Sequence, residues 1–105
     1  MKTAITSTGE TLDSKIDPRF GRCSYFVIYD SELKSFEFIP NPNKNADEGA
    51  GPASVQLIAG KKVTKIVSGE FGIKIKPLLD SLHIQMIIVK DSNKTVKEII
   101  ELLNK

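Results

Sequence analysis

The residues best suited to chemistry gather in the run 17–26, which contains the only cysteine of the chain, Cys23, beside Arg22 and shortly after Arg19. A cysteine acts as a nucleophile or metal ligand in its thiolate form, and neighbouring cations lower its pKa. If both arginines turn towards the thiol, Cys23 is the best candidate metal ligand. The alternative is that Cys23 packs as a small hydrophobic residue at the start of a strand.

Glycine motifs form the second chemical feature. Gly49 and Gly51 precede one predicted helix, and Gly69 and Gly72 precede another. Exposed backbone N–H groups at the start of a helix favour anions. We therefore predict that these glycines, with Gly21, approach a small anionic ligand. Tight strand-to-helix turns also need glycine without any ligand, and this alternative stays open.

Two further predictions concern charged and metal-binding side chains. His83 is the only imidazole of the chain, at the end of a predicted helix, where it either binds metal or caps helix carbonyls. Arg19 and Arg22 have a structural alternative to ligand binding, namely salt bridges to Asp13 or Asp17, which contribute little at a surface.

The composition is that of one globular domain spanning residues 1–105, with 40% hydrophobic and 27% charged residues. The net charge of +2 is spread along the chain, which argues against a nucleic-acid partner. No apolar run approaches the roughly 20 residues of a membrane span. A single cysteine and the absence of a signal-peptide core predict a cytoplasmic protein without a membrane partner.

Hydrophobic periodicity predicts the elements that must position these residues. Residues 3–7 form a central strand, residues 25–30 and 34–39 form a hairpin, and residues 40–48 form a mobile loop. The second half alternates helices and strands. Its predicted elements are a helix from Pro52 to residue 59, a strand at 63–68, a helix at 78–82, a strand at 84–89 and a helix at 95–103 with a Thr95/Glu98 capping box.

The order βββαβαβα predicts an α/β fold with a mixed five-stranded sheet, because helices between parallel strands require right-handed crossovers and the hairpin adds an antiparallel pair. Ligands bind such sheets outside the carboxyl ends of the parallel strands. We expect the segment 68–72 and the glycine-rich loop before Pro52 to meet there.

These motifs together carry a resemblance that covers nearly the whole chain. They are Phe20-Gly21-Arg22-Cys23 before an aromatic strand, Gly49-Ala50-Gly51 opening a helix, Gly69-x-x-Gly72 after a strand, and Thr95-Val96-x-Glu98. The chain resembles the dinitrogenase iron-molybdenum cofactor biosynthesis family. The resemblance implies a ribonuclease H-like fold with helices on both faces of the sheet. It also implies a role in binding or carrying iron-sulfur-type clusters during assembly of the nitrogenase cofactor.

The resulting hypothesis is a non-catalytic carrier of an iron-sulfur or iron-molybdenum type cluster. One thiolate and one imidazole cannot hold a permanent four-cysteine cluster, but a thiolate with backbone N–H groups and arginines can hold an anionic cluster transiently. The predicted cofactor-binding residues are Arg19, Gly21, Arg22, Cys23, Gly49, Gly51, Gly69 and Gly72, and the predicted metal-binding residues are Cys23 and His83. The expected partners are metallocofactor assembly proteins or an acceptor metalloenzyme, and the protein is a monomer or a homodimer.

Two other hypotheses remain from the sequence. A small-anion-sensing or protein-interaction module would use the same glycine loops without any metal. A two-metal nuclease, suggested by the ribonuclease H-like fold, needs carboxylates on the core strands. The predicted strands 3–7 and 63–68 contain no acidic residue, so we expect no enzyme.

Overall fold

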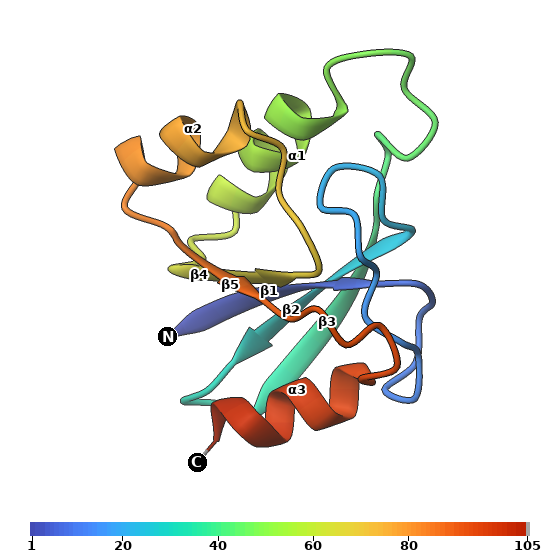
Figure 1. The fold of residues 1–105 in the computed structure, drawn as a ribbon. Coiled ribbons are helices and arrows are strands. Elements are labelled where there is room, and N and C mark those ends of the chain that lie inside the picture. The colour runs from blue at the N-terminus through green and yellow to red at the C-terminus, as the bar shows by residue number, and fades with distance from the viewer. Residues whose placement is uncertain (105) are drawn as a thin grey trace.

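The computed structural model describes residues 1–104 and contains the predicted element order. Five strands and three helices follow one another as β1 (Lys2–Ser7), β2 (Tyr25–Asp30), β3 (Ser35–Pro40), α1 (Ala50–Ala59), β4 (Lys65–Ser68), α2 (Ile75–Ser81), β5 (Gln85–Ile88) and α3 (Val96–Leu103). The strands form one mixed sheet in the order β3-β2-β1-β4-β5 (Figure 1). The central place of β1 is thereby confirmed.

Pairing within the sheet follows the direction of each connection. The β2–β3 hairpin is antiparallel, as predicted, and β2 is also antiparallel to β1. β1, β4 and β5 are parallel to one another. Because α1 and α2 provide the connections on either side of β4, the carboxyl ends of these three strands meet at one edge of the sheet.

Helices cover both faces of the sheet, with α1 and α2 on one face and α3 on the other (Figure 1). Successive residues of a strand point to opposite faces, so Ala4 and Ile5 of β1 belong to two different cores. The first core contains Val55 of α1 and the second contains Val96 of α3. This arrangement confirms the predicted α/β fold of the ribonuclease H-like type.

Helix boundaries differ from the predictions mainly at the amino-terminal ends. α1 begins at Ala50, after Gly49 in the left-handed conformation with φ of 77°, so Pro52 lies within the first turn rather than before it. α2 begins at Ile75 and includes Pro77 in its first turn. A proline there removes no helical hydrogen bond. The sequence placed both helices too late because it treated proline as the first helical residue.

The amino-terminal end of α3 carries the predicted capping box. The Thr95 hydroxyl accepts a hydrogen bond from the backbone N–H of Glu98 at 3.2 Å, and the Glu98 carboxylate accepts one from the Thr95 N–H at 3.1 Å. These bonds satisfy two backbone groups that a helix end otherwise leaves unpaired. Across residues 1–104, none of the helices combines the length and the apolar character that a membrane crossing requires.

Candidate binding site at the carboxyl edge of the sheet

Three segments meet at the edge where β1, β4 and β5 end. The connection 8–24 crosses this edge before β2 begins, since Tyr25 pairs with Ser7 at the end of β1. Arg19 in that connection forms a parallel β-bridge with Glu70, which follows β4. The third segment is the loop that leads into α1. The predicted meeting of the glycine loops at this edge is therefore confirmed.

The three segments enclose a hollow of about 390 Å³, which we call the rim hollow. Its walls are formed by Arg19, Phe20, Gly21, Arg22, Gly49, Ala50, Gly51, Glu70, Gly72 and Ile75. Six of the eight predicted cofactor-binding residues thus lie together. Gly69 lines a neighbouring cavity of about 350 Å³ instead, and Glu70 borders both spaces.

Arg19 is positioned at the rim hollow by a buried carboxylate. One oxygen of Asp17 accepts hydrogen bonds from the Arg19 backbone N–H at 2.9 Å and from Arg19 Nε at 3.4 Å. The Asp17 side chain is only 3% exposed, whereas that of Arg19 is 54% exposed. The Asp17 backbone is itself fixed to Thr6 of β1 through two hydrogen bonds. The predicted Arg19–Asp17 salt bridge is confirmed, and it leaves much of the arginine open to solvent.

Arg22 is held differently, by carbonyl groups of the loop before α1. Its guanidinium donates hydrogen bonds to the carbonyl oxygens of Ala46 and Asp47. The predicted alternative of a salt bridge from Arg22 to Asp13 or Asp17 is wrong, because these carbonyls take the donors. A carbonyl carries no formal charge, so the positive charge of Arg22 stays uncompensated in this contact.

Close backbone packing explains three of the predicted glycines. A Cβ atom on Gly21 would lie 3.0 Å from both the Cα and the N of Gly51, and one on Gly51 would lie 2.6 Å from Cδ1 of Ile75. A Cβ atom on Gly69 would lie 2.5 Å from the Cα of Pro18. The structural alternative therefore accounts for these three positions whether or not a ligand binds.

The other two predicted glycines are not required by packing. A Cβ atom on Gly72 would meet only Ile75, at an ordinary contact distance of 3.8 Å. Gly49 needs its left-handed backbone, but nothing lies within 4 Å of where its Cβ would be. The amino-terminal entrance to α1 is thus open on the side of the rim hollow.

Sequence reasoning missed two residues that fix the turn at residues 21–23. The side-chain amide of Asn41, a buried residue, donates to the carbonyl oxygens of Gly21 at 3.0 Å and Cys23 at 2.9 Å. The hydroxyl of Ser54, fully buried in α1, donates to Gly21 at 3.3 Å. The available indication was a polar residue at an inward position of α1 and an asparagine enclosed by two prolines.

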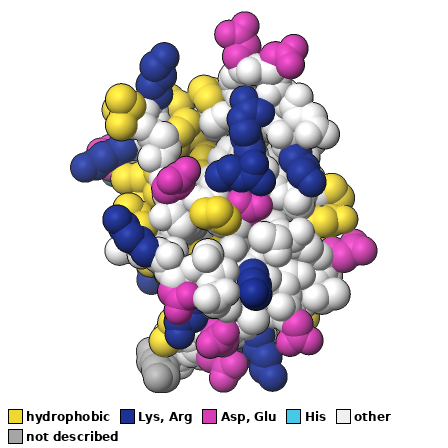
Figure 2. Space-filling view, turned by 45° about the vertical axis from the view of Figure 1, so that its right-hand side comes forward, with side chains coloured by type: hydrophobic (Ala, Val, Ile, Leu, Met, Phe, Trp, Pro, Cys, Tyr) yellow, Lys and Arg dark blue, Asp and Glu magenta, His cyan; other side chains and the backbone are white. Residues whose placement is uncertain are grey.

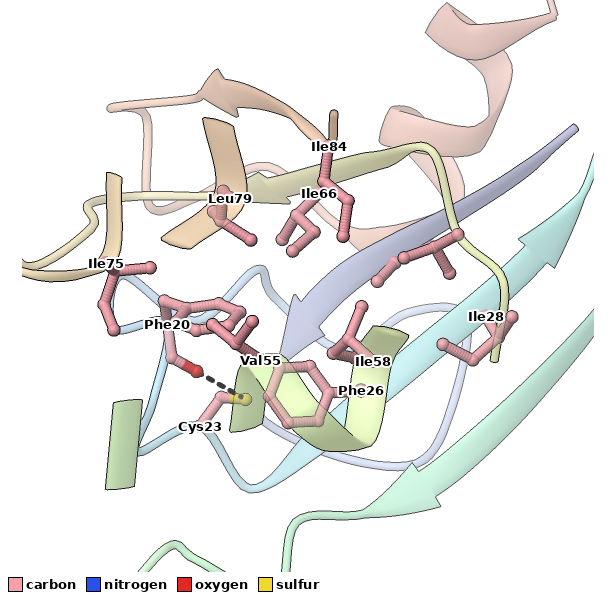
Figure 3. Packing of buried hydrophobic residues seen from close by; sticks show 12 residues of the cluster. Phe20, Cys23, Phe26, Ile28, Val55, Ile58, Ile66, Ile75, Leu79 and Ile84 are labelled. Carbon is pink, nitrogen blue, oxygen red and sulfur yellow. Dashed lines mark hydrogen bonds between the residues drawn. The ribbon is translucent and has the colours of Figure 1, made fainter. Parts of the chain in front are cut away.

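Cys23 turns away from the rim hollow into the first core, where it lies beside Phe26 (Figure 3). Its side chain is fully buried, and the thiol donates a hydrogen bond to the Phe20 carbonyl at 3.4 Å. Burial, followed by the negative charge of Asp17, raises the pKa of Cys23 from its ordinary value of 9.0 to about 12. The prediction of an arginine-stabilised thiolate is wrong, because both guanidinium groups are bonded elsewhere.

His83 lies at the opposite edge of the sheet from Cys23. It is exposed, adopts a left-handed φ of 58°, and comes just before β5, whereas Cys23 precedes the antiparallel strand β2. The predicted pairing of Cys23 and His83 at one metal ion is therefore wrong. Within residues 1–104, no group of three or more His, Cys, Asp and Glu side chains is arranged to hold a metal ion.

The surface around these elements carries mixed charge. Figure 2 shows Lys and Arg side chains over the upper part of one face, with Asp and Glu side chains at its top and towards its lower end. Within the rim hollow two arginines face one carboxylate, that of Glu70. Such a balance favours a small anion at the hollow rather than an extended polyanion on the surface.

The fold and the hollow together define a small α/β protein of the ribonuclease H-like type, with an anion-compatible site at the carboxyl edge of its sheet. The chain belongs to the dinitrogenase iron-molybdenum cofactor family, because the sequence profile of that family matches residues 1–105. The resemblance carried by the glycine motifs is thereby confirmed.

Individual relatives share both sequence and fold with this chain. The uncharacterized protein MJ0580 of Methanocaldococcus jannaschii is 31% identical over 93 residues, which cover 86% of this chain and 77% of the relative. The apo form of the orange protein from Desulfovibrio gigas superimposes with a TM-score of 0.89 at 27% identity, over 97% of this chain and 85% of that one. TM1290 of Thermotoga, described as a candidate NifB protein, gives a TM-score of 0.82 at 30% identity with the same coverage.

Proposed function

We propose that this protein is a non-catalytic carrier that binds an anionic iron-sulfur or iron-molybdenum type cluster as cargo in the rim hollow during metallocofactor assembly. Family membership supports a role in cofactor biosynthesis or cluster binding. The observation that carries the proposal is the joining of two arginines with the open amino-terminal end of α1 in one hollow. Its expected partners are cofactor assembly proteins or an acceptor metalloenzyme.

Backbone groups supply part of the attraction for an anion. α1 starts without any side-chain cap and without an acidic residue in its first turn. Its first N–H groups therefore keep their hydrogen-bonding capacity and the partial positive charge of the helix end. Because Gly49 and Gly51 carry no side chains, an anion of cluster size can approach these groups closely.

Side chains supply the rest, and none of them needs to form a covalent bond to metal. Arg19 and Arg22 are both in the wall of the hollow, and their charge-assisted hydrogen bonds to sulfide or other anionic atoms are stronger than neutral ones. Cys23 stays in the core as a protonated thiol. Binding through hydrogen bonds and charge is reversible, as delivery to an acceptor requires.

The test is an anaerobic titration of the purified full chain with a synthetic iron-sulfur cluster and with isolated iron-molybdenum cofactor, followed by absorbance. We expect saturable binding that Arg22→Gln weakens about tenfold, equivalent to about 1.4 kcal/mol of lost charge-assisted bonding. Lys97→Gln is the matched control, because it removes one positive charge from exposed α3 on the other face of the sheet.

The outcomes separate the hypotheses. Saturable binding that Cys23→Ser leaves unchanged agrees with the proposal, whereas loss of binding in a folded Cys23→Ser protein contradicts the non-thiolate mode. Absence of binding to either cluster overturns the carrier function. Saturable binding of inorganic phosphate in its place, sensitive to Arg22→Gln, would instead support the anion-sensing module, since the uncapped α1 end also suits phosphate.

A further inference from the structure

The two edge strands of the sheet are protected to different degrees. β3 contains Glu37 and ends at Pro40, and both a charge and a proline discourage pairing with another chain. β5 has the sequence Gln-Met-Ile-Ile, without a charge or a proline. Ile88 at its end is 54% exposed. The β5 edge is therefore the one that is open to strand addition.

Backbone groups of β5 point outward in a regular register. The N–H of Gln85 donates to Thr64 and that of Val89 donates to Ser68, each at 2.9 Å, on the side of β4. In a parallel ladder alternate residues bond the same neighbour, so the N–H and C=O groups of Met86 and Ile88 point away from β4. Across residues 1–104, β5 pairs with no strand other than β4.

An apolar groove runs along the same edge. It has a volume of about 230 Å³ and is lined by Phe71, Gly72, Ile73, Lys76, Met86 and Ile88. Ile73 is 91% exposed, which is unusual for a large aliphatic side chain that has apolar neighbours. The edge thus offers both unpaired backbone groups and apolar surface.

We propose that β5 pairs antiparallel with β5 of a second copy of this chain, around a two-fold axis at Ile87, so that the two sheets become continuous. This register places Met86 opposite Ile88 of the second copy, and Ile88 opposite its Met86. Both residues have outward-facing backbone groups, so each opposed pair exchanges two hydrogen bonds. A two-fold axis uses the same surface on both copies and closes after two chains.

Side chains agree with this register. Met86 packs against the first core on the face of α1 and α2, and alternation places Ile88 on the same face. Each Ile88 therefore packs beside a Met86 of the other copy, an apolar cross-strand pair. At the ends of the strands, His83 of one copy approaches Asp91 of the other, which allows an imidazole–carboxylate contact. A strand of unrelated sequence would not supply all of these matches.

The test is the mass of the full chain, measured by sedimentation and by size exclusion with light scattering, from about 10 µM to about 1 mM. We expect a monomer–dimer equilibrium whose dissociation constant rises at least about tenfold in Ile88→Lys. Phe36→Lys on β3 is the matched control, because Phe36 is also a half-exposed edge residue. Circular dichroism checks that each variant is folded.

Ile73→Lys provides a second variant whose folding is secure, since the side chain is almost fully exposed. It should also weaken the dimer. A monomer at every concentration overturns the proposal. So does a dimer that Phe36→Lys disrupts and Ile88→Lys does not, and so does growth beyond two copies. The cargo titration with Arg22→Gln is unaffected by any of these outcomes.

Discussion

Cys23 follows three residues that line the rim hollow, yet its side chain enters the core beneath them. The reversal arises in the turn at residues 21–23, where Asn41 binds the carbonyls on either side of Arg22. Arg22 therefore faces the loop before α1 while Cys23 packs between Phe26 and α1. A single turn separates the residue that presents charge from the residue that contributes packing.

We expect the raised pKa of Cys23 to make stability depend on pH in alkaline solution. Between about pH 9 and pH 12 the unfolded thiol ionises while the folded thiol stays protonated, so stability falls as the pH rises through this window. At pH 10 this loss is about 1.4 kcal/mol. Urea unfolding at pH 8 and pH 10 measures it, with Cys23→Ala as the reference. Equal pH dependence in both proteins would contradict the buried thiol.

At this scale the sequence predicted which residues gather but not how each side chain turns. Arg19, Arg22 and the glycines meet at the hollow as expected. The thiolate at Cys23 was wrong because adjacency in the chain says nothing about burial, and a desolvated thiol resists ionisation. The metal pair with His83 was wrong because the chain separation of 60 positions gives no information on which edge of the sheet each residue occupies.

The amino-terminal end of α1 is positioned by backbone-to-backbone contact with the turn at Gly21. Gly21 and Gly51 approach so closely that neither position has room for a side chain. The Ser54 hydroxyl adds a hydrogen bond from the next turn of the helix to the Gly21 carbonyl. These contacts couple the geometry of the arginine-bearing turn to that of the helix end.

Gly21→Ala should therefore destabilise the protein, because its Cβ would meet backbone atoms that cannot rotate away. The expected loss is about 1–3 kcal/mol, typical of an overpacked site. Gly72→Ala is the matched control in the same hollow, since its Cβ meets only Ile75 at 3.8 Å, and it should change stability by less than about 0.5 kcal/mol. Chemical denaturation measures both. Similar stability of the two variants would exclude the packing role of Gly21.

Most elements were predictable from the sequence because alternation and turn residues are local properties. The strands, their order and the Thr95/Glu98 capping box follow from such patterns. The first turns of α1 and α2 were not predicted, because a left-handed Gly49 and a proline inside the first turn depend on surrounding packing. The same dependence hid Asn41, which looks like an ordinary loop residue.

Across the whole molecule, the two ends of the sheet serve different purposes. The carboxyl edge carries the rim hollow, whereas the β5 edge carries the proposed dimer contact. Antiparallel pairing of two β5 strands directs the carboxyl edges of the two copies in opposite directions. Each copy would therefore bind its own cargo, and the two Cys23 thiols would not come together to form a shared ligand set.

The connection between β1 and β2 has a consequence for amide hydrogen exchange. Although residues 8–24 form neither a helix nor a named strand, Ile16 donates to Lys94 at 2.8 Å, and Val96 and Lys97 donate back to Ser14 and Leu12. Each of these amides is released only when the connection and the start of α3 separate. Deuterium should therefore enter Ile16 and Val96 as slowly as it enters the central strands. Rapid entry at Ile16 alone would show that this rim opens independently of α3.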